Sequence, residues 1–412
     1  MVGRRSVLVA VAICIAAVNV GFVPATAASS APVLPVTWSH VVGGNARAMA
    51  MGAGAVYVML PSQVLALSRR DGRVMWRAPL ACETLYVSVP NVLDGQCASS
   101  AGAAAMPVAL DGRSGRQLVR APNSALCLVD ERGAVVLQSN PTTGQPVALV
   151  RYSFATGRPV WTVKTSLYYC TGAGRFVIAT DGCCSGSGDP AGYSIIDARS
   201  GALRSHEDAI WIGLDAQGNN VACQGAGVVG YDAAGRFMWT RAATCSDDGF
   251  GMVGPASVTD QGVMKMFDDA DGTALVREEP SQHPPGLDGT IAGGPFDVVL
   301  QQGQDEAGCD VARFLSPGGL SPLITDAAPL FTPVNDHSMV FETPAPQGCT
   351  APRRRLQDID ASGAVRWSTA PLASNNFLSH IAVTDGWPGH DATAIAAVDA
   401  FSTIRYYALP QR

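Results

Sequence analysis

The sequence is poor in charged side chains, and in lysine above all. Charged residues make up 15% of the 412 residues, and Lys164 and Lys265 are the only lysines. Acidic residues outnumber basic ones by 34 to 28. Nucleic acids and anionic lipid surfaces are bound through clusters of Lys and Arg, so the composition argues against both as main partners. A disordered chain is also excluded, because 47% of the residues are hydrophobic.

Beyond its N-terminus the sequence has no apolar run long enough to span a bilayer. The exception covers residues 7–23 and follows the basic pair Arg4-Arg5. Ala25 and Ala27 then supply the small residues that a signal peptidase recognises. These features predict a signal peptide over residues 1–27.

Removal of this segment leaves a short tether over residues 28–35 and a single folded domain over residues 36–412. We expect the mature protein to be secreted or held in the cell envelope, and not to be an integral membrane protein. An uncleaved membrane anchor is the alternative, because the apolar run approaches the shortest length that spans a bilayer. The Arg4-Arg5 pair leaves the export route open between the general and the twin-arginine pathway.

The cysteines lack the Cys-x₂₋₄-Cys spacing that is typical of zinc sites. Cys14 lies in the signal peptide, so ten of the eleven cysteines remain in the mature chain. An even number of cysteines in an exported protein predicts disulfides, because the compartment is oxidising. We therefore expect no metal at these residues and no free thiol. The ten disulfide candidates are Cys82, Cys97, Cys127, Cys170, Cys183, Cys184, Cys223, Cys245, Cys309 and Cys349.

Four segments share one pattern: a short apolar strand, a turn that contains glycine, and a tryptophan four residues after that glycine. Because the chain has only seven tryptophans, chance is a poor explanation. Looser copies lie between these units, and the intervals between turn glycines run from 34 to 47 residues. Such a period is typical of repeat architectures and argues against an ordinary β-sandwich. The four clear units contain Gly72 and Trp76, Gly157 and Trp161, Gly235 and Trp239, and Gly363 and Trp367.

Each part of the repeat has a physical reason. The strand is apolar because it packs between neighbouring sheets. The turn glycine takes a positive φ without steric penalty, and an Asp before it bonds nearby backbone. The tryptophan is large enough to fill the gap between two sheets near their outer rim. We therefore expect these tryptophans to be buried structural anchors, and each repeat to form one four-stranded blade of a propeller.

This pattern resembles the PQQ-like (pyrroloquinoline-quinone-type) β-propeller repeat. The family includes quinoprotein alcohol dehydrogenases and BamB-like scaffold proteins of outer-membrane assembly. The resemblance implies an all-β, PQQ-like β-propeller of four-stranded antiparallel sheets. Looser copies at Gly115, Gly201, Gly272 and Gly319, and a last copy that ends at Asp399, raise the number of candidate hairpins to nine. The family has seven or eight blades, so we predict eight, within a range of seven to nine.

Two further expectations follow from a propeller. The strand around Trp38 should pair with residues 404–409 and close the ring, which removes an exposed sheet edge. Disulfide partners should lie in the same blade or in adjacent blades, although sequence alone does not fix the connectivity. Cys183 and Cys184 either form a vicinal disulfide or bridge to separate partners. The simplest local set for the others is Cys82–Cys97, Cys127–Cys170, Cys223–Cys245 and Cys309–Cys349.

Catalytic constellations are harder to find. The pair Cys183-Cys184 favours a quinoprotein dehydrogenase, because quinoprotein alcohol dehydrogenases stack a vicinal disulfide on their cofactor. The acidic calcium ligands and the catalytic Asp of those enzymes have no matching motif here. Residues 267–278 partly resemble a calcium loop, but Phe267 stands at the first ligand position, so a solvated turn is the better interpretation. His390-Asp391 and the basic run Arg353-Arg354-Arg355 are interpreted as a surface loop and a solvated edge.

The sequence therefore favours a binding protein over an enzyme. We predict a non-catalytic binding or scaffold protein of the cell envelope, with no cofactor, no metal and no nucleic acid, and with an envelope protein or glycan as its partner. A quinone- or metal-dependent oxidoreductase is the first alternative. An enzyme acting on envelope carbohydrate is the second, and it would need two convergent carboxylates.

Overall fold

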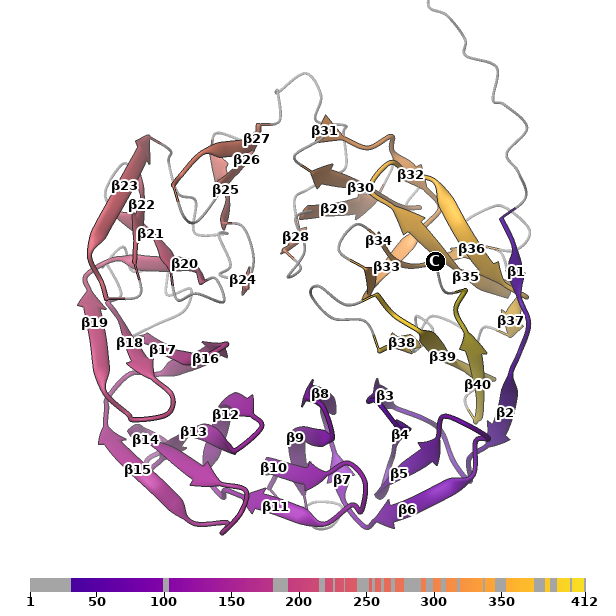
Figure 1. The fold of residues 1–412 in the computed structure, drawn as a ribbon, viewed down its shortest axis with the longest axis horizontal. Helices are drawn as coiled ribbons and strands as arrows, with labels where there is room; N and C mark the ends of the chain where they lie inside the picture. Colours follow the sequence, from indigo (N-terminus) through magenta and orange to yellow (C-terminus); the bar gives the residue numbers. More distant parts are fainter. Residues whose placement is uncertain are drawn as a thin grey trace, which may run out of the picture. The chain divides into compact units, whose positions relative to one another are not determined.

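The structure is a computed structural model in which the described elements are all β-strands (Figure 1). Residues 1–31 and 32–412 form separate units, and the second is described below. The expected signal peptide, residues 1–27, lies outside the described residues. The described residues are 31–98, 104–180, 192–214, 219–224, 227–232, 234–242, 252–253, 256–260, 263–267, 271–277, 290–293, 299–304, 309–316, 319–335, 338–344, 353–373, 382–385, 391–400 and 402–410.

Sheets 1 to 4 follow one another along the chain. Sheet 1 contains β3 (Ala48–Met51), β4 (Ala55–Leu60), β5 (Gln63–Ser68) and β6 (Val74–Ala78). Sheet 2 contains β7 (Ala81–Cys82), β8 (Tyr86–Val89), β9 (Val92–Ala98), β10 (Met106–Asp111) and β11 (Gln117–Arg120). Sheet 3 contains β12 (Ser124–Asp130), β13 (Gly133–Ser139), β14 (Pro146–Ser153) and β15 (Pro159–Lys164). Sheet 4 contains β16 (Tyr169–Ala173), β17 (Phe176–Thr180), β18 (Tyr193–Asp197) and β19 (Leu203–Glu207).

Sheets 5 to 9 complete the described strands. Sheet 5 contains β20 (Ile210–Leu214), β21 (Asn220–Gln224), β22 (Gly227–Tyr231), β23 (Phe237–Ala242) and β24 (Met252–Val253). Sheet 6 contains β25 (Ala256–Asp260), β26 (Val263–Phe267) and β27 (Ala274–Arg277). Sheet 7 contains β28 (Thr290–Gly293), β29 (Val299–Gln304), β30 (Asp310–Ser316), β31 (Gly319–Leu320) and β32 (Ile324–Thr325). Sheet 8 contains β33 (Ala328–Asn335), β34 (Ser338–Pro344), β35 (Arg353–Asp360), β36 (Val365–Thr369), β37 (Leu372–Ala373) and β1 (Val33–Leu34). Sheet 9 contains β38 (Ala382–Thr384), β39 (Ala394–Asp399), β40 (Thr403–Ala408) and β2 (Trp38–Val41).

Apolar cores join successive sheets around the ring. One buried cluster contains side chains of sheets 1 and 2, and similar clusters join sheets 2 and 3, 3 and 4, 4 and 5, 7 and 8, and 8 and 9. A further cluster joins sheet 9 back to sheet 1. In sheets 1 and 9 the second strands, β4 and β39, are buried throughout, because both of their faces pack against neighbouring sheets. The protein is therefore an all-β propeller, as the repeat predicts.

The predicted number of eight blades is not confirmed, because the described strands form nine sheets. Seven of the eight turn glycines lie in the turn between two adjacent strands of one sheet, as Gly72 does between β5 and β6, and Gly319 is the first residue of β31. The ninth candidate hairpin, at Asp399, differs because it joins β39 to β40, the second and third strands of sheet 9. The fourth strand of that sheet comes from the N-terminal end of the domain.

This fourth strand is β2, and it closes the ring as expected. Trp38 pairs with Tyr406 in antiparallel register, and Val41 pairs with Thr403. Within the predicted tether, Val33 and Leu34 form β1, which pairs in parallel with β36 of sheet 8. The N-terminal end of the domain thus adds edge strands to the last two sheets.

Three of the four repeat tryptophans, Trp76, Trp161 and Trp239, lie over the turn glycine of the next unit. A Cβ atom at Gly115 would lie 2.7 Å from the Trp76 ring, and Gly201 is covered in the same way by Trp161. The indole N–H of Trp76 donates to the Gly112 carbonyl oxygen at 2.9 Å. Trp239 and Trp367 are buried as expected, whereas Trp76 and Trp161 are only half-buried.

Two disulfides of the expected local set are formed in the structure, Cys82–Cys97 and Cys127–Cys170. The first joins β7 to β9 within sheet 2, and the second joins sheets 3 and 4. Cys223 and Cys309 are also disulfide-bonded. The other expected disulfide cysteines, Cys183, Cys184, Cys245 and Cys349, lie outside the described residues.

Candidate functional site

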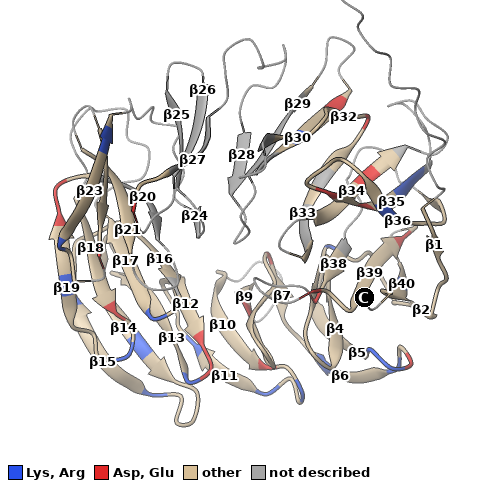
Figure 2. Cartoon of the chain, turned by 45° about the horizontal axis from the view of Figure 1, so that its top comes forward, with Lys and Arg blue, Asp and Glu red and all other residues tan. Residues whose placement is uncertain are grey.

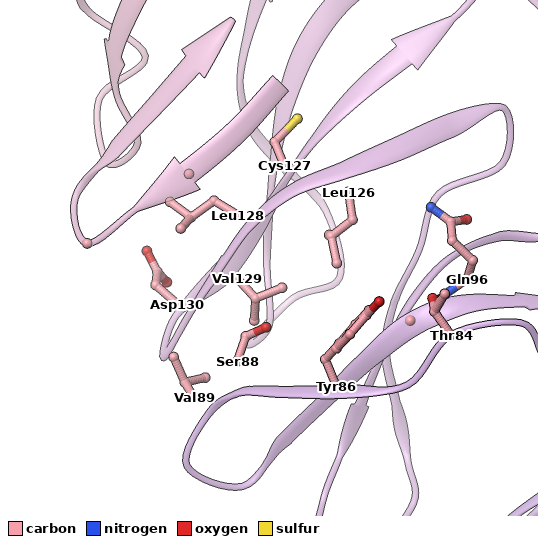
Figure 3. A pocket seen from close by; sticks show the side chains of 13 residues that line it. Thr84, Tyr86, Ser88, Val89, Gln96, Leu126, Cys127, Leu128, Val129 and Asp130 are labelled. Carbon is pink, nitrogen blue, oxygen red and sulfur yellow. The ribbon is translucent and has the colours of Figure 1, made fainter. Parts of the chain in front are cut away.

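A pocket of about 660 Å³ lies where three strands of sheets 2, 3 and 4 meet (Figure 3). These strands are β8, β12 and β16, and in Figure 1 they lie toward the middle of the drawing, whereas β11, β15 and β19 lie at its periphery. We call this site the inner-wall pocket. Its volume falls in the range of roughly 300–1,000 Å³ that is typical of small-molecule sites.

Tyr86 of β8 is the most exposed large side chain of the pocket lining, with 57% of its surface accessible. Thr84 and Ser88 stand two residues before and after it, and Gln96 of β9 lies beside Thr84 in Figure 3. The backbone N–H of Gln96 donates to the Thr84 hydroxyl oxygen at 3.0 Å, which orients that hydroxyl. Leu126 and Leu128 of β12 provide the apolar side of the lining. An aromatic ring is therefore surrounded by neutral hydrogen-bonding groups and aliphatic side chains.

Asp130 is the one carboxylate in the pocket lining, and its oxygens are already engaged. Arg151 donates to both of them, at 2.9 and 2.7 Å. The backbone N–H groups of Arg132 and Gly133 donate to Oδ1 at 2.8 and 2.9 Å. Arg151 is buried and also donates to the Ala198 carbonyl oxygen of the next sheet at 3.0 Å. This carboxylate therefore orders the wall between sheets 3 and 4.

A second carboxyl group lies just behind the lining. Asp94 of β9 is buried, and its Oδ1 accepts the backbone N–H of Ser88 at 3.3 Å. Burial raises the pKa of Asp94 to about 6, although the hydrogen bonds from Ser88 favour the charged form. The carboxyl group holds in place the segment of β8 that carries Tyr86.

Glycines and disulfides keep the pocket walls close together. A Cβ at Gly172 of β16 would lie 2.6 Å from the Leu128 Cβ, so only glycine permits this approach of β16 to β12. A Cβ at Gly95 would overlap the carbonyl oxygen of Thr84. The disulfide Cys127–Cys170 ties β12 to β16 covalently, and Cys82–Cys97 ties β7 to β9. The site therefore stands on a rigid part of the fold.

A second pocket of about 600 Å³ lies near the two ends of the domain and is lined by Pro32 and Pro410. Two of its charged side chains, Asp358 and Arg366, make contacts within the protein. Asp358 is fully buried, and the Arg366 Nε lies 3.6 Å from its Oδ2. Arg366 also donates to the Ser338 hydroxyl oxygen at 3.1 Å.

Several residues singled out in the sequence lie away from the inner-wall pocket. Asp391 lines the second pocket, and His390 lies outside the described residues. In the calcium-like segment, Asp271 accepts the Thr273 backbone N–H at 2.7 Å, which is the geometry of a turn. In the part of the chain that the structure describes, no group of three or more His, Cys, Asp or Glu is placed to hold a metal ion.

The interpretation of the basic run Arg353-Arg354-Arg355 as a solvated edge is wrong. It lies in β35, the third strand of sheet 8, and Arg354 and Arg355 are half-buried. The Arg354 Nε lies 3.5 Å from Oε1 of the buried Glu342 on the adjacent strand. Figure 2 shows charged segments scattered over the sheets, with most of the described ribbon in the colour of the other residues.

Apart from the disulfide cysteine Cys127, the residues of the inner-wall pocket carry no pattern that the sequence marks as functional. They come from three repeats, at strand positions that the repeat pattern leaves variable. One signal in the sequence does mark the region: the disulfide cysteines Cys82, Cys97, Cys127 and Cys170 bracket it closely.

Comparisons with known proteins bear on the fold. No protein family and no curated protein sequence matches the chain. Among solved structures, a eukaryotic initiation factor is similar at a TM-score of 0.53 and 12% identity, over 84% of this chain and 91% of that one. The Dos1 propeller has a TM-score of 0.47 at 11% identity, over 92% and 96% of the two chains. BamB from Moraxella catarrhalis has a TM-score of 0.43 at 11% identity, over 92% and 99%. At such low identity these likenesses concern the propeller fold alone.

Proposed function

We propose that the chain is a non-catalytic binding or scaffold protein of the cell envelope, built on PQQ-like repeats, that captures its partner at the inner-wall pocket. The observation that carries the proposal is Tyr86, a large aromatic side chain that is 57% exposed in a concave site on the walls of three sheets. Tyrosine is enriched in binding sites because its ring buries a large area and its hydroxyl offers a hydrogen bond.

The binding function is supported by how the pocket is built. Both oxygens of Asp130 accept hydrogen bonds from Arg151, which suits an ordering role better than proton transfer. Two disulfides and two close-packed glycines hold the walls, so little conformational entropy is lost when a partner binds.

The envelope location is supported by the cysteines and by the N-terminal sequence. Disulfides form and persist in oxidising compartments, and two are formed between described residues. Among the described residues, the structure has no helix with the length and hydropathy of a membrane span. The PQQ-like assignment is supported by the packing of Trp76 and Trp161 over the turn glycines of the next repeats.

Site-specific photo-crosslinking tests the proposal. A benzophenone amino acid is introduced at position 86 or at position 169 of the full exported chain in the producing cells. Tyr169 is a matched control because it is 55% exposed and lies on β16 outside the pocket lining. We expect a discrete adduct with an envelope component from position 86 and none from position 169. The absence of an adduct at position 86, or equal adducts from both positions, would contradict the proposal.

A further inference from the structure

The hydrogen-bonding side chains around Tyr86 are neutral. Thr84 and Ser88 provide hydroxyl groups, and Gln96 provides an amide. Hydroxyl and amide groups both donate and accept hydrogen bonds. In Figure 3, Ser88 lies on one side of Tyr86 and Thr84 with Gln96 on the other. A ligand that carries many hydroxyl groups would find both donors and acceptors within one short stretch of the wall.

The one charged side chain of the pocket lining, Asp130, is satisfied within the protein. Asp130 is bonded by Arg151 and by two backbone N–H groups, and Arg151 is 5% exposed. A ligand with a formal charge would lose its hydration there without gaining an available counter-ion from these two residues, and that loss is costly. An uncharged ligand avoids the penalty.

Tyr86 supplies the attraction that a polar but uncharged ligand needs. The face of an aromatic ring is electrostatically negative, and the C–H groups on one face of a sugar ring are weakly positive. Stacking of the two also removes apolar surface of the exposed ring from water.

We infer that the inner-wall pocket binds a neutral carbohydrate, with a sugar ring stacked on Tyr86 and its hydroxyl groups bonded by Thr84, Ser88 and Gln96. The inference rests on the proposed binding function and names the chemical class of its ligand. The walls are built before the ligand arrives, because the Cys127–Cys170 disulfide and Gly172 fix β12 against β16. The sugar ring would therefore enter a preformed site, which lowers the entropic cost of binding.

Calorimetric titration of the purified, disulfide-intact protein tests the inference. The probes are cellotetraose, maltotetraose, mannotetraose and chitotetraose, with tetragalacturonate as an anionic probe of similar size. We expect saturable binding of at least one neutral tetraose, and binding of tetragalacturonate at least about tenfold weaker. The Tyr86→Ala variant should raise the Kd for the neutral probe about tenfold or more, whereas Tyr86→Phe, which keeps the ring, should stay within about threefold.

The Tyr169→Ala variant is the matched control and should bind as the unmodified protein does. Circular dichroism and thermal unfolding of each variant verify that it is folded. Binding of none of the neutral tetraoses, or equal affinity in the Tyr86→Ala variant, would overturn the inference. If position 86 still crosslinks to an envelope protein in that case, the proposed function stands and only the carbohydrate assignment fails. If neither experiment gives a signal at position 86, both fail.

Discussion

The rings of Trp38 and Tyr406 are stacked, with centroids 5.0 Å apart and planes inclined by 1°. Arg69, from the turn after β5, lies over the same tyrosine and donates to its hydroxyl at 3.1 Å. The guanidinium group also reaches Asp385 and Thr393 of sheet 9, at 2.8 Å in each case. These contacts join the first sheet to the last, so the closure of the ring depends on more than strand pairing.

Replacement of Arg69 should therefore destabilise the whole ring. The side chains of Arg69 and Asp385 are only 14% and 13% exposed, and the Arg69→Met variant would leave that carboxylate without its partner. We expect the free energy of unfolding to fall by about 3 kcal/mol, as when one partner of a largely buried ion pair is removed. Urea unfolding followed by tryptophan fluorescence measures the change.

Arg73→Met is the control for this prediction. Arg73 pairs with Asp71 at 2.7 Å, but its side chain is 84% exposed. Exposed ion pairs contribute about 0–1 kcal/mol, so this variant should unfold almost as the unmodified protein does. Equal losses from the two replacements would show that Arg69 does not hold the ring closed.

The contact between Trp76 and Gly115 makes a second prediction. Gly115 has a φ of 72° and would bring a Cβ to within 2.7 Å of the indole ring. Gly144 has the same φ, but its Cβ would meet nothing within 4 Å. In the Gly144→Ala variant the free energy of unfolding should thus fall by about 1–2 kcal/mol, which is the cost of an alanine in a left-handed conformation. In the Gly115→Ala variant the free energy of unfolding should fall by this amount and by about 1–3 kcal/mol more, because the new methyl group overpacks the site. The same unfolding assay measures both variants. Similar losses of stability in the two variants would mean that the Trp76 ring moves aside at little energetic cost.

The same contact explains what could be predicted from sequence. Gly recurs because each turn needs a residue with a positive φ, and Trp recurs because its ring packs on the turn glycine of the next repeat. Both requirements are local, so they appear as a repeated pattern in the sequence. Trp38 obeys the same logic, and its pairing with Tyr406 could be expected even though the two residues are far apart in sequence. The nine candidate hairpins counted in the sequence each fall in one of the nine sheets, and the predicted number of eight came from the blade number of the resembled family rather than from the residues.

The inner-wall pocket could not be predicted in this way. Tyr86, Asp130 and Gly172 belong to three repeats and meet only because successive sheets pack with a particular offset. The strands that line the pocket, β8, β12 and β16, carry no fixed residue type, unlike the repeat turns that contain glycine. The pairing of β8 with β9 also shifts register between Tyr86 and Val89, and no spacing of residue types in the sequence predicts that shift.

The pKa of Asp94 makes a third prediction. Burial raises this pKa from 3.8 to about 6, so between about pH 4 and 6 the folded state holds a proton that the unfolded state has released. The stabilising contribution of the group is fully present below about pH 4 and is lost as the pH rises to about 6. It amounts to about 3 kcal/mol over that window. The Asp94→Asn variant should remove this dependence and be more stable than the unmodified protein above pH 6.

Urea unfolding at a series of pH values, with the disulfides intact, measures the difference between the two proteins. Asp208→Asn is the control for the loss of one carboxylate, because the Asp208 side chain is 87% exposed. A stability difference between Asp94→Asn and the unmodified protein that does not change between pH 4 and 7 would disprove the assignment.

The two disulfides at the pocket should differ in what their removal costs. Cys127–Cys170 spans 43 residues and joins two sheets, whereas Cys82–Cys97 spans 15 residues within one sheet. In the chain-entropy model, a closed loop of these lengths stabilises the folded state by about 4 and about 3 kcal/mol respectively. The paired replacement Cys127→Ser/Cys170→Ser should therefore lower the free energy of unfolding by about 1 kcal/mol more than Cys82→Ser/Cys97→Ser does.

The paired replacement Cys127→Ser/Cys170→Ser should also loosen β12 against β16, because Gly172 lets these strands approach without a side chain between them. Hydrogen exchange of the β12 amides should then rise in the Cys127→Ser/Cys170→Ser variant and stay unchanged in the other. Equal protection of β12 in both variants would mean that strand packing alone holds the pocket wall.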